Sequence, residues 1–136
     1  MLAAGAKLSG ILLERQGDAI VIGFGVNLAS HPDEADRPAT SIGALSGSAP
    51  DPKTFLDDLA ASFERWLGRW RGEGLAPVRG QWLASAHPAG TALSTHNSAG
   101  ARIDGLFDGL DESGALRLRL ADGSSHVIHA GDVFLI

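Results

Sequence analysis

The chain contains no cysteine, which excludes disulfide bonds, thiolate metal sites and cysteine nucleophiles. Long hydrophobic runs are also missing, and the apolar stretches fall far short of the roughly 20 residues that a membrane helix needs. Residues 1–7 show no basic leader followed by a long apolar run, as a secretory signal would. We therefore expect a cytoplasmic protein with no membrane attachment.

Positive charge is scarce: 11 Lys and Arg face 16 Asp and Glu, for a net charge of −5. Duplex nucleic acid is bound largely by neutralising its phosphates, and an acidic chain without an extended basic run is poorly suited to that. Four arginines between Arg65 and Arg79 are interpreted as the solvated face of a helix. The composition therefore predicts no nucleic-acid partner.

Common catalytic motifs are absent as well. No Gly-x-Ser-x-Gly elbow is present, so a hydrolase interpretation has no anchor. His126 and His129 lie three residues apart on a predicted strand and would point to opposite faces, so no metal site is predicted. The carboxylate pairs Asp57–Asp58 and Asp111–Glu112 fall on an exposed helix face and in a turn. None of these features predicts acid–base chemistry.

The 136 residues suffice for one compact domain or two small ones, and 44% are hydrophobic, enough for a core. Residues 7–15 and 19–27 are predicted strands joined by a tight turn at 16–18. The continuous run Ala19–Ile22 predicts burial on both faces, as in the middle of a sheet covered by helices. A short helical turn is expected after Thr40 and Ser41.

Asp51 and Pro52 open the clearest predicted helix, because aspartate caps free N–H groups and proline is tolerated in the first turn. Apolar residues follow at helical spacing as far as Arg71 and Gly72, where a cationic last turn and a stop are expected. The stripe includes Trp66 and Trp70, which we interpret as core residues. A second, shorter helix is predicted around residues 75–82.

Beyond His87 the pattern changes to short alternating runs separated by recurrent glycine. Strands are expected at 101–107, 115–120, 126–128 and 133–136, and about five short strands in this region indicate a small barrel. The sequence thus predicts an α+β protein with two parts. Residues 1–86 would carry part of a mixed sheet with packed helices, and residues 87–136 the barrel.

The two N-terminal strands have unusual interiors. Gly10 interrupts the first, and Gly23 and Gly25 interrupt the second, which ends in Asn27. Glycine inside a strand often marks close approach of another group to the backbone. With Lys7 at the head of the first strand, this pattern looks like half of a ligand site. Two alternatives are that the glycines relieve crowding and that the lysine is an ordinary surface residue. The third glycine of a dinucleotide fingerprint is missing, because position 28 is leucine.

Taken together, Lys7-Leu8-Ser9-Gly10-Ile11-Leu12 and Gly23-Phe24-Gly25-Val26-Asn27 resemble the second half of the catalytic domain of bacterial biotin protein ligases. The resemblance continues through Pro38–Ile42, Gly74–Trp82 and three segments near the C-terminus, namely 103–105, 113–116 and 130–133. It implies a class II synthetase-like half-domain over residues 1–86 and an SH3-like barrel over residues 87–136. The resemblance covers nearly the whole chain, in order.

The resemblance implies ATP-dependent ligation of biotin. The biotin carboxylate would attack the α-phosphate of ATP, giving biotinyl-5'-adenylate and pyrophosphate, and a lysine of a biotin carboxyl carrier protein domain would then accept the biotin. By this resemblance Lys7 is the catalytic lysine and binds biotin together with Gly10 and Ile11. Gly23, Gly25 and Asn27 would bind the nucleotide. Biotin and ATP are the expected substrates, with Mg²⁺ accompanying ATP although no ligand for it is visible.

The chain also departs from the family. The Gly-Arg-Gly-Arg-type phosphate loop and the Trp-Pro-Asn-Asp step before the lysine are absent. We therefore expect a truncated site, arising from a fragment, an internal methionine taken as the start, or a remnant gene. The alternative functions are a non-catalytic module whose barrel recognises the carrier or complements a missing N-terminal half, and an adaptor unrelated to biotin. An unpaired sheet edge would also favour a homo-oligomer.

Overall fold

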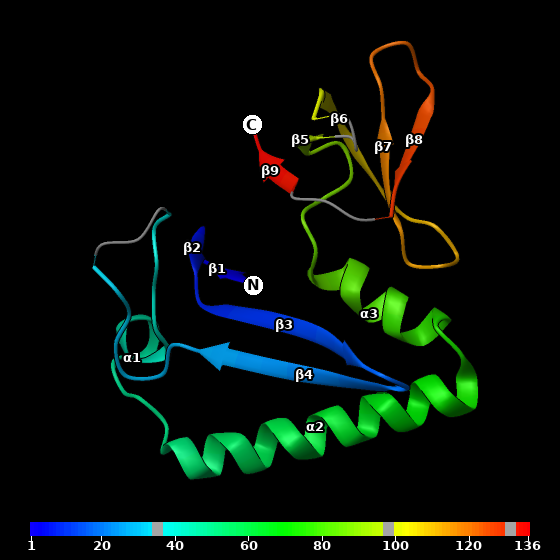
Figure 1. Ribbon diagram of the computed structural model, residues 1–136. Helices are drawn as coiled ribbons and strands as arrows, with labels where there is room; N and C mark the ends of the chain where they lie inside the picture. Colours follow the sequence, from blue (N-terminus) through cyan, green and yellow to red (C-terminus); the bar gives the residue numbers. More distant parts are fainter. Residues whose placement is uncertain (34–36, 97–99, 130–132) are drawn as a thin grey trace. The chain divides into compact units, whose positions relative to one another are not determined.

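The computed structural model describes residues 1–33, 37–96, 100–129 and 133–136 (Figure 1). The chain is an α+β protein with two compact units, Met1–Ala61 and Ser62–Ile136. The division falls inside α2 (Pro52–Glu73). This division reflects which residues of the chain contact one another. The domain boundary between residues 86 and 87 stays a prediction.

The first unit is built on one long hairpin, preceded by the short strands β1 (Leu2–Ala3) and β2 (Ala6–Lys7). Strands β3 (Ser9–Gln16) and β4 (Ala19–Val26) pair antiparallel over their full length. Gly17 has a φ of 61°, so glycine makes the turn between them without the cost that a Cβ would add. The hairpin predicted from the sequence is confirmed.

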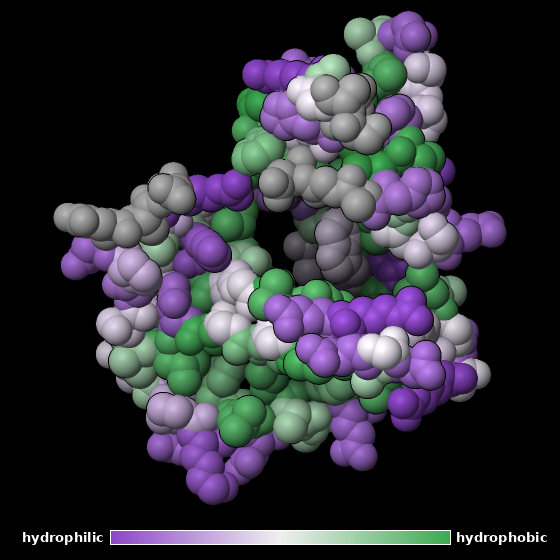
Figure 2. All heavy atoms as spheres, viewed as in Figure 1, coloured by the Kyte–Doolittle hydropathy of each residue, from purple (hydrophilic) through white to green (hydrophobic). Residues whose placement is uncertain are grey.

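The predicted burial of this hairpin is wrong. Ile20 and Val21 are 55% and 53% exposed, and Leu12 and Leu13 are each 62% exposed. β3 and β4 form a two-stranded sheet, and within the described ranges no third strand pairs with either of them. Apolar side chains accordingly reach the surface around the hairpin (Figure 2). An Ala-Ile-Val-Ile run specifies strand, but burial requires neighbouring elements that this run does not itself encode.

Two helices begin in the first unit, and the second of them continues into the second unit. The short α1 (Ile42–Ser46) begins at Ser41, whose hydroxyl accepts a hydrogen bond from the Ala44 N–H at 3.2 Å. At the start of α2 the Asp51 carboxylate accepts from the Thr54 N–H at 2.9 Å, and this bond lowers the pKa of Asp51. Both predicted helix starts are confirmed, because each depends only on a cap within a few residues.

The apolar stripe of α2 contains no fully buried residue. Trp70 is 53% exposed, so its interpretation as a core residue is wrong. Trp66 is half-buried and lies 5.0 Å from the Arg69 guanidinium, which also pairs with Glu73 at 3.1 Å. Helical spacing aligns these side chains on one face, while the amount of cover depends on the surrounding elements.

The second unit contains α3 (Ala76–Ser85) and a five-stranded antiparallel sheet. Its strands are β5 (Ala92–His96), β6 (Arg102–Leu110), β7 (Leu116–Arg119), β8 (Ser125–Ile128) and β9 (Val133–Leu135), in the order β8-β7-β6-β5-β9. The four predicted strands are confirmed, and β5 was not located from the sequence. In the described part of the chain the sheet does not close into a barrel.

A small core holds this second unit together. Leu93, Phe107 and Leu118 are buried against one another, with Leu118 fully inaccessible. On α3 the Trp82 ring lies 6.2 Å from the Phe107 ring, edge to face. The Arg79 guanidinium donates a 2.8 Å hydrogen bond to the carbonyl of Asp111, in the loop between β6 and β7. α3 is therefore fixed to this sheet by an aromatic contact and a hydrogen bond.

Candidate functional site

Both backbone hydrogen-bonding groups of Lys7 are bonded to a distant segment. Its N–H donates to the Pro38 carbonyl at 2.8 Å, and its carbonyl accepts from the Thr40 N–H at 3.0 Å. These two bonds form a parallel bridge between Lys7 and Ala39. Residues 38–40, which we call the bridging segment, therefore fix the backbone from which the lysine side chain extends.

The Lys7 side chain is exposed and lies beside Gly10. A Cβ added at Gly10 would sit 4.0 Å from Lys7 Cε, so the lysine stem reaches toward the face of the hairpin that carries this glycine. The chain has a second lysine, Lys53, which pairs with Asp57 at 2.9 Å. Within the described residues no carboxylate lies within ion-pair distance of the Lys7 ammonium. Among the described residues, therefore, none neutralises the Lys7 charge through an ion pair.

Gly10, Gly23 and Gly25, which we call the glycine strip, lie on one face of the hairpin, which also carries Leu12. Gly10 is paired directly with Gly25, and Gly23 is paired with Leu12 two residues further along the hairpin. Side chains alternate along a strand, so Gly10, Gly23 and Gly25 share one face. A Cβ at any of the three would meet nothing closer than 3.9 Å, and none has a left-handed φ. Neither crowding nor backbone conformation in this chain requires glycine at these positions.

Ile11 faces the other way. It pairs with Phe24 on the opposite face of the hairpin and is 56% exposed. Its backbone borders the glycine strip, while its side chain does not. A ligand on the glycine face would therefore contact the backbone of Ile11. It would contact the Ile11 side chain only by extending around the edge of the strand.

Asn27 connects the parts of the site. Its carboxamide nitrogen donates to the Thr40 carbonyl at 2.9 Å and lies 3.4 Å from the Lys7 carbonyl. Its own backbone N–H donates to Leu8, and its carbonyl accepts from the Ile42 N–H, each at 3.0 Å. Asn27 thus joins the end of β4 to β2, the bridging segment and the start of α1. Lys7, Gly10, Gly25 and Asn27 come together at this end of the hairpin.

Two buried polar residues next to this site were not predicted as functional. Thr40 and Ser41 are 8% and 1% exposed. The Ser41 hydroxyl donates to the Ala29 carbonyl at 3.3 Å and lies 3.4 Å from His31 Nδ1. The cap signal at Ser41 was readable from the sequence, whereas the pairing of its neighbours with Lys7 was not. These contacts make residues 38–41 a structural support for the site.

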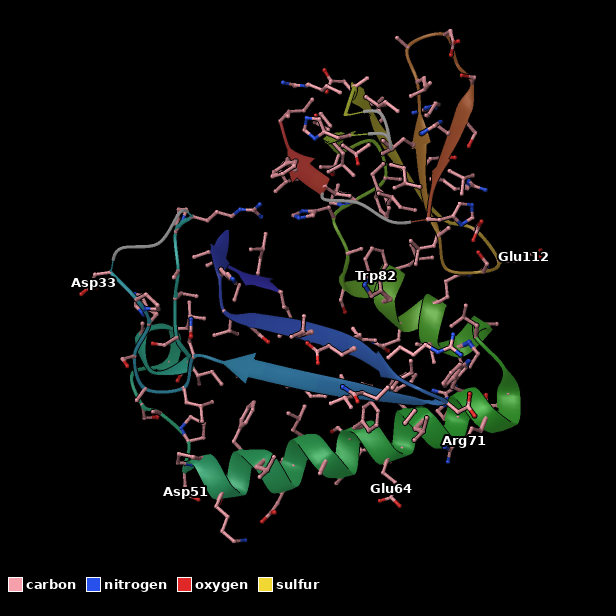
Figure 3. The ribbon with its side chains drawn as sticks, viewed as in Figure 1. Asp33, Asp51, Glu64, Arg71, Trp82 and Glu112 are labelled. Carbon is pink, nitrogen blue, oxygen red and sulfur yellow. The ribbon has the colours of Figure 1, made fainter. Side chains whose placement is uncertain are left out.

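Four described carboxylates can be placed. Asp33 and Asp51 lie apart from each other in the first unit (Figure 3), so they form no acid–base pair. Glu112 extends outward, whereas the Asp111 carboxylate accepts from Ser113 Oγ at 2.8 Å and from the Ala115 N–H at 2.9 Å. The Ser113 hydroxyl is the main cause of the lowered pKa of Asp111. These contacts show the Asp111 carboxylate stabilising a turn.

Nowhere in the described residues do three or more acidic or histidine side chains gather in a way that could hold a metal ion. The described residues therefore offer no cluster of three such side chains that could hold Mg²⁺. None of the helices in the described ranges combines the length and the apolar character needed to cross a bilayer.

Comparison with known proteins identifies the relatives of this arrangement. The family described as biotin protein ligase C terminal domain matches residues 98–136. A biotin--[acetyl-CoA-carboxylase] ligase from Paracoccus denitrificans is 40% identical over 98% of this chain and 59% of its own length. The chain is a relative of the biotin protein ligases. The corresponding Mycobacterium tuberculosis ligase is 31% identical over 98% of this chain and 49% of its own length.

Solved biotin protein ligases share the fold. The apo enzyme from Aquifex aeolicus superimposes with a TM-score of 0.87 at 20% identity, covering 98% of this chain and 61% of that one. The Aquifex enzyme in complex with biotin and ATP gives a TM-score of 0.85 at 20% identity, covering 97% and 57%. This chain therefore spans about half to three-fifths of the length of the ligases that it matches.

Proposed function

We propose that this chain provides part of the biotin and adenylate site of a biotin protein ligase. In the reaction, the biotin carboxylate attacks the α-phosphate of ATP, forming biotinyl-5'-adenylate and releasing pyrophosphate. A lysine amine of a biotin carboxyl carrier protein domain then attacks the acyl carbon, forming an amide and releasing AMP. The sheet of the second unit would be the SH3-like C-terminal domain of such an enzyme. Support comes from the ligase relatives, which match nearly the whole chain.

The observation that carries the proposal is the glycine strip beside Lys7. Gly10, Gly23 and Gly25 leave part of one hairpin face, beside Leu12, without side chains, although no atom of the described residues comes closer than 3.9 Å to where their Cβ atoms would be. Such a strip lets a flat ring approach the peptide planes within van der Waals distance. We assign Gly10, with the Ile11 backbone, to biotin, and Gly23, Gly25 and Asn27 to the nucleotide.

Lys7 supplies the charge that this reaction needs. The two reactants are anions, and further negative charge develops on the α-phosphate in the transition state. A fixed ammonium at about 4 Å contributes on the order of 4 kcal/mol at an effective dielectric near 20, before desolvation is counted. An ammonium held in place before the reaction stabilises the transition state without reorganising. We therefore assign Lys7 as the catalytic residue that holds the biotin carboxylate and the phosphate together.

Substituting the glycines separates binding from folding. Gly10→Ala and Gly25→Ala introduce methyl groups with open space around them, so neither should lower the unfolding temperature. Each should weaken binding of a stable biotinyl-adenylate analogue at least tenfold, since a loss of about 1.4 kcal/mol suffices for that. Leu13→Ala, on the opposite face, is the matched control and should bind like the parent. Unchanged binding by both glycine variants, or no thermal shift of the parent chain with the analogue, would refute the assignment.

The site is proposed to be partial. The chain has no arginine-rich phosphate loop, and such loops supply much of the transition-state charge stabilisation in phosphoryl chemistry. The 136-residue chain should therefore form no detectable biotinyl-adenylate alone. Biotin-dependent ATP–pyrophosphate exchange by the pure chain would contradict this.

A second candidate function is complementation in trans, as a binding module for a missing half or for the carrier protein. The exposed apolar hairpin favours it: Ile11 and Leu13 are 56% and 62% exposed on a sheet of two strands. Self-association through this surface would give a homo-oligomer instead. Mixing the chain with an N-terminal half of a ligase distinguishes the cases, because complementation restores biotin transfer, whereas self-association only increases the mass in solution.

A further inference from the structure

Asn27 lies where three segments meet, and its side chain acts on the backbone of the lysine. Its carboxamide nitrogen bonds the Thr40 carbonyl at 2.9 Å and approaches the Lys7 carbonyl at 3.4 Å. The Lys7 carbonyl also accepts from the Thr40 N–H at 3.0 Å. One amide group therefore links both sides of the parallel bridge and restrains their separation.

We propose that Asn27 is a positioning residue that, with the bridging segment, fixes the Lys7 ammonium beside the glycine strip. This rests on the proposed function, in which Lys7 contacts the anionic substrates, and it adds a role for Asn27 besides nucleotide contact. The bridge itself is short, because β2 has two residues, pairs with β1 along its other edge, and meets the bridging segment only where Lys7 pairs with Ala39. Without the side-chain link, two backbone hydrogen bonds would hold Lys7 to the bridging segment.

The energetic argument favours a role in positioning. The net contribution of a single hydrogen bond is small, so losing the Asn27 amide weakens the bridge without removing its backbone bonds. A group that is misplaced by about 1 Å can lose about a hundredfold in catalysis. We therefore expect the Asn27→Ala variant to hold the Lys7 side chain less firmly while it stays nearly as stable as the parent chain.

The composition of the chain provides a direct assay. Lys7 and Lys53 are its two lysines, so a chain labelled with ¹³C,¹⁵N-lysine gives two sets of side-chain signals. Lys53, 82% exposed and paired with Asp57, is the internal reference. In the parent chain the Lys7 Cε–Hε signals should differ from their values in urea. In Asn27→Ala they should move at least halfway to those values, while the Lys53 signals stay unchanged.

Thr40→Val is the matched control, because it keeps the shape and the backbone groups of the bridging segment while changing its one buried hydroxyl. It should leave the Lys7 signals as in the parent. If the Lys7 signals of Asn27→Ala match the parent, or if both variants shift them equally, the positioning role is wrong. Both results are independent of ligand binding, so they can be told apart from a failure of the ligase proposal.

A measurement on the parent chain covers the case in which Asn27→Ala does not fold. The bridge predicts that the amide protons of Lys7 and Thr40 exchange with solvent at least tenfold more slowly than in the unfolded chain. Unprotected exchange at both amides would overturn the proposal. If both amides are protected and Asn27→Ala does not fold, the signals are measured in Asn27→Ser. This variant retains one hydrogen-bond donor and should partly restore the Lys7 signals.

Discussion

Alanine at Gly105 should destabilise the second unit, although glycine-to-alanine changes inside strands usually help or do little. A Cβ at this position would lie 3.0 Å from the Arg119 carbonyl oxygen, 3.2 Å from Leu118 Cβ and 3.3 Å from Leu120 Cδ2. The first two atoms belong to the backbone and to the base of a fully buried side chain, so neither can rotate away. The strands β6 and β7 must therefore separate by a few tenths of an ångström.

The magnitude follows from two opposing effects. Overpacking of a well-packed site costs about 1–3 kcal/mol. The lower entropy of the unfolded chain returns about 0.4–1 kcal/mol when alanine replaces glycine. The net loss of unfolding free energy is then about 1–2 kcal/mol. For a unit of this size that corresponds to a decrease of roughly 4–16 °C in unfolding temperature.

Gly80→Ala is the matched control in the same unit. Gly80 lies in α3 with no atom within 4 Å of an added Cβ, so its replacement should raise stability by up to about 1 kcal/mol. Thermal unfolding followed by circular dichroism measures both variants. If Gly105→Ala is as stable as the parent chain, the close approach of β6 to β7 is not what requires glycine there.

Two further predictions concern the same unit. Leu118→Ala should lower the unfolding free energy by about 2–5 kcal/mol, because this side chain is 0% exposed, whereas Leu135→Ala, 51% exposed, should cost far less; equal losses in urea unfolding would contradict the assigned core. Hydrogen bonds lower the pKa of Asp111, and the largest effect comes from the Ser113 hydroxyl. The ionised carboxylate therefore stabilises the folded chain above the usual aspartate pKa, and this contribution is lost as pH falls through the lowered value. Asp111→Asn should therefore flatten the acid side of the stability profile, and an unchanged profile in acid titration would refute that contribution.

The two lysines of the chain differ in their surroundings. Of the two lysines, one is paired with a carboxylate and the other lies beside a bare strip of backbone. An exposed pair such as Lys53–Asp57 contributes little to stability. Lys7 has no such partner among the described residues, and its ammonium is therefore the one we assign to the substrates.

The sequence by itself determined the local elements. The hairpin at Gly17, the helical turn after Ser41, the cap at Asp51 and the strand β7 each depend on residues close together in the chain, and all appear where expected. The residue types of the candidate site were also readable, because a lysine, interior glycines and an asparagine at this spacing are an unusual set in two adjacent strands.

Only the tertiary structure decided which of these residues meet and which remain uncovered. The pairing of Lys7 with residues 38–40 joins segments about thirty positions apart, and no local pattern encodes that register. The predictions of burial were wrong for the same reason. The Ala19–Ile22 run and Trp70 are apolar, but their burial depends on other elements packed against them. Local preferences arise from neighbouring residues, whereas burial and long-range hydrogen bonds depend on the positions of distant backbone.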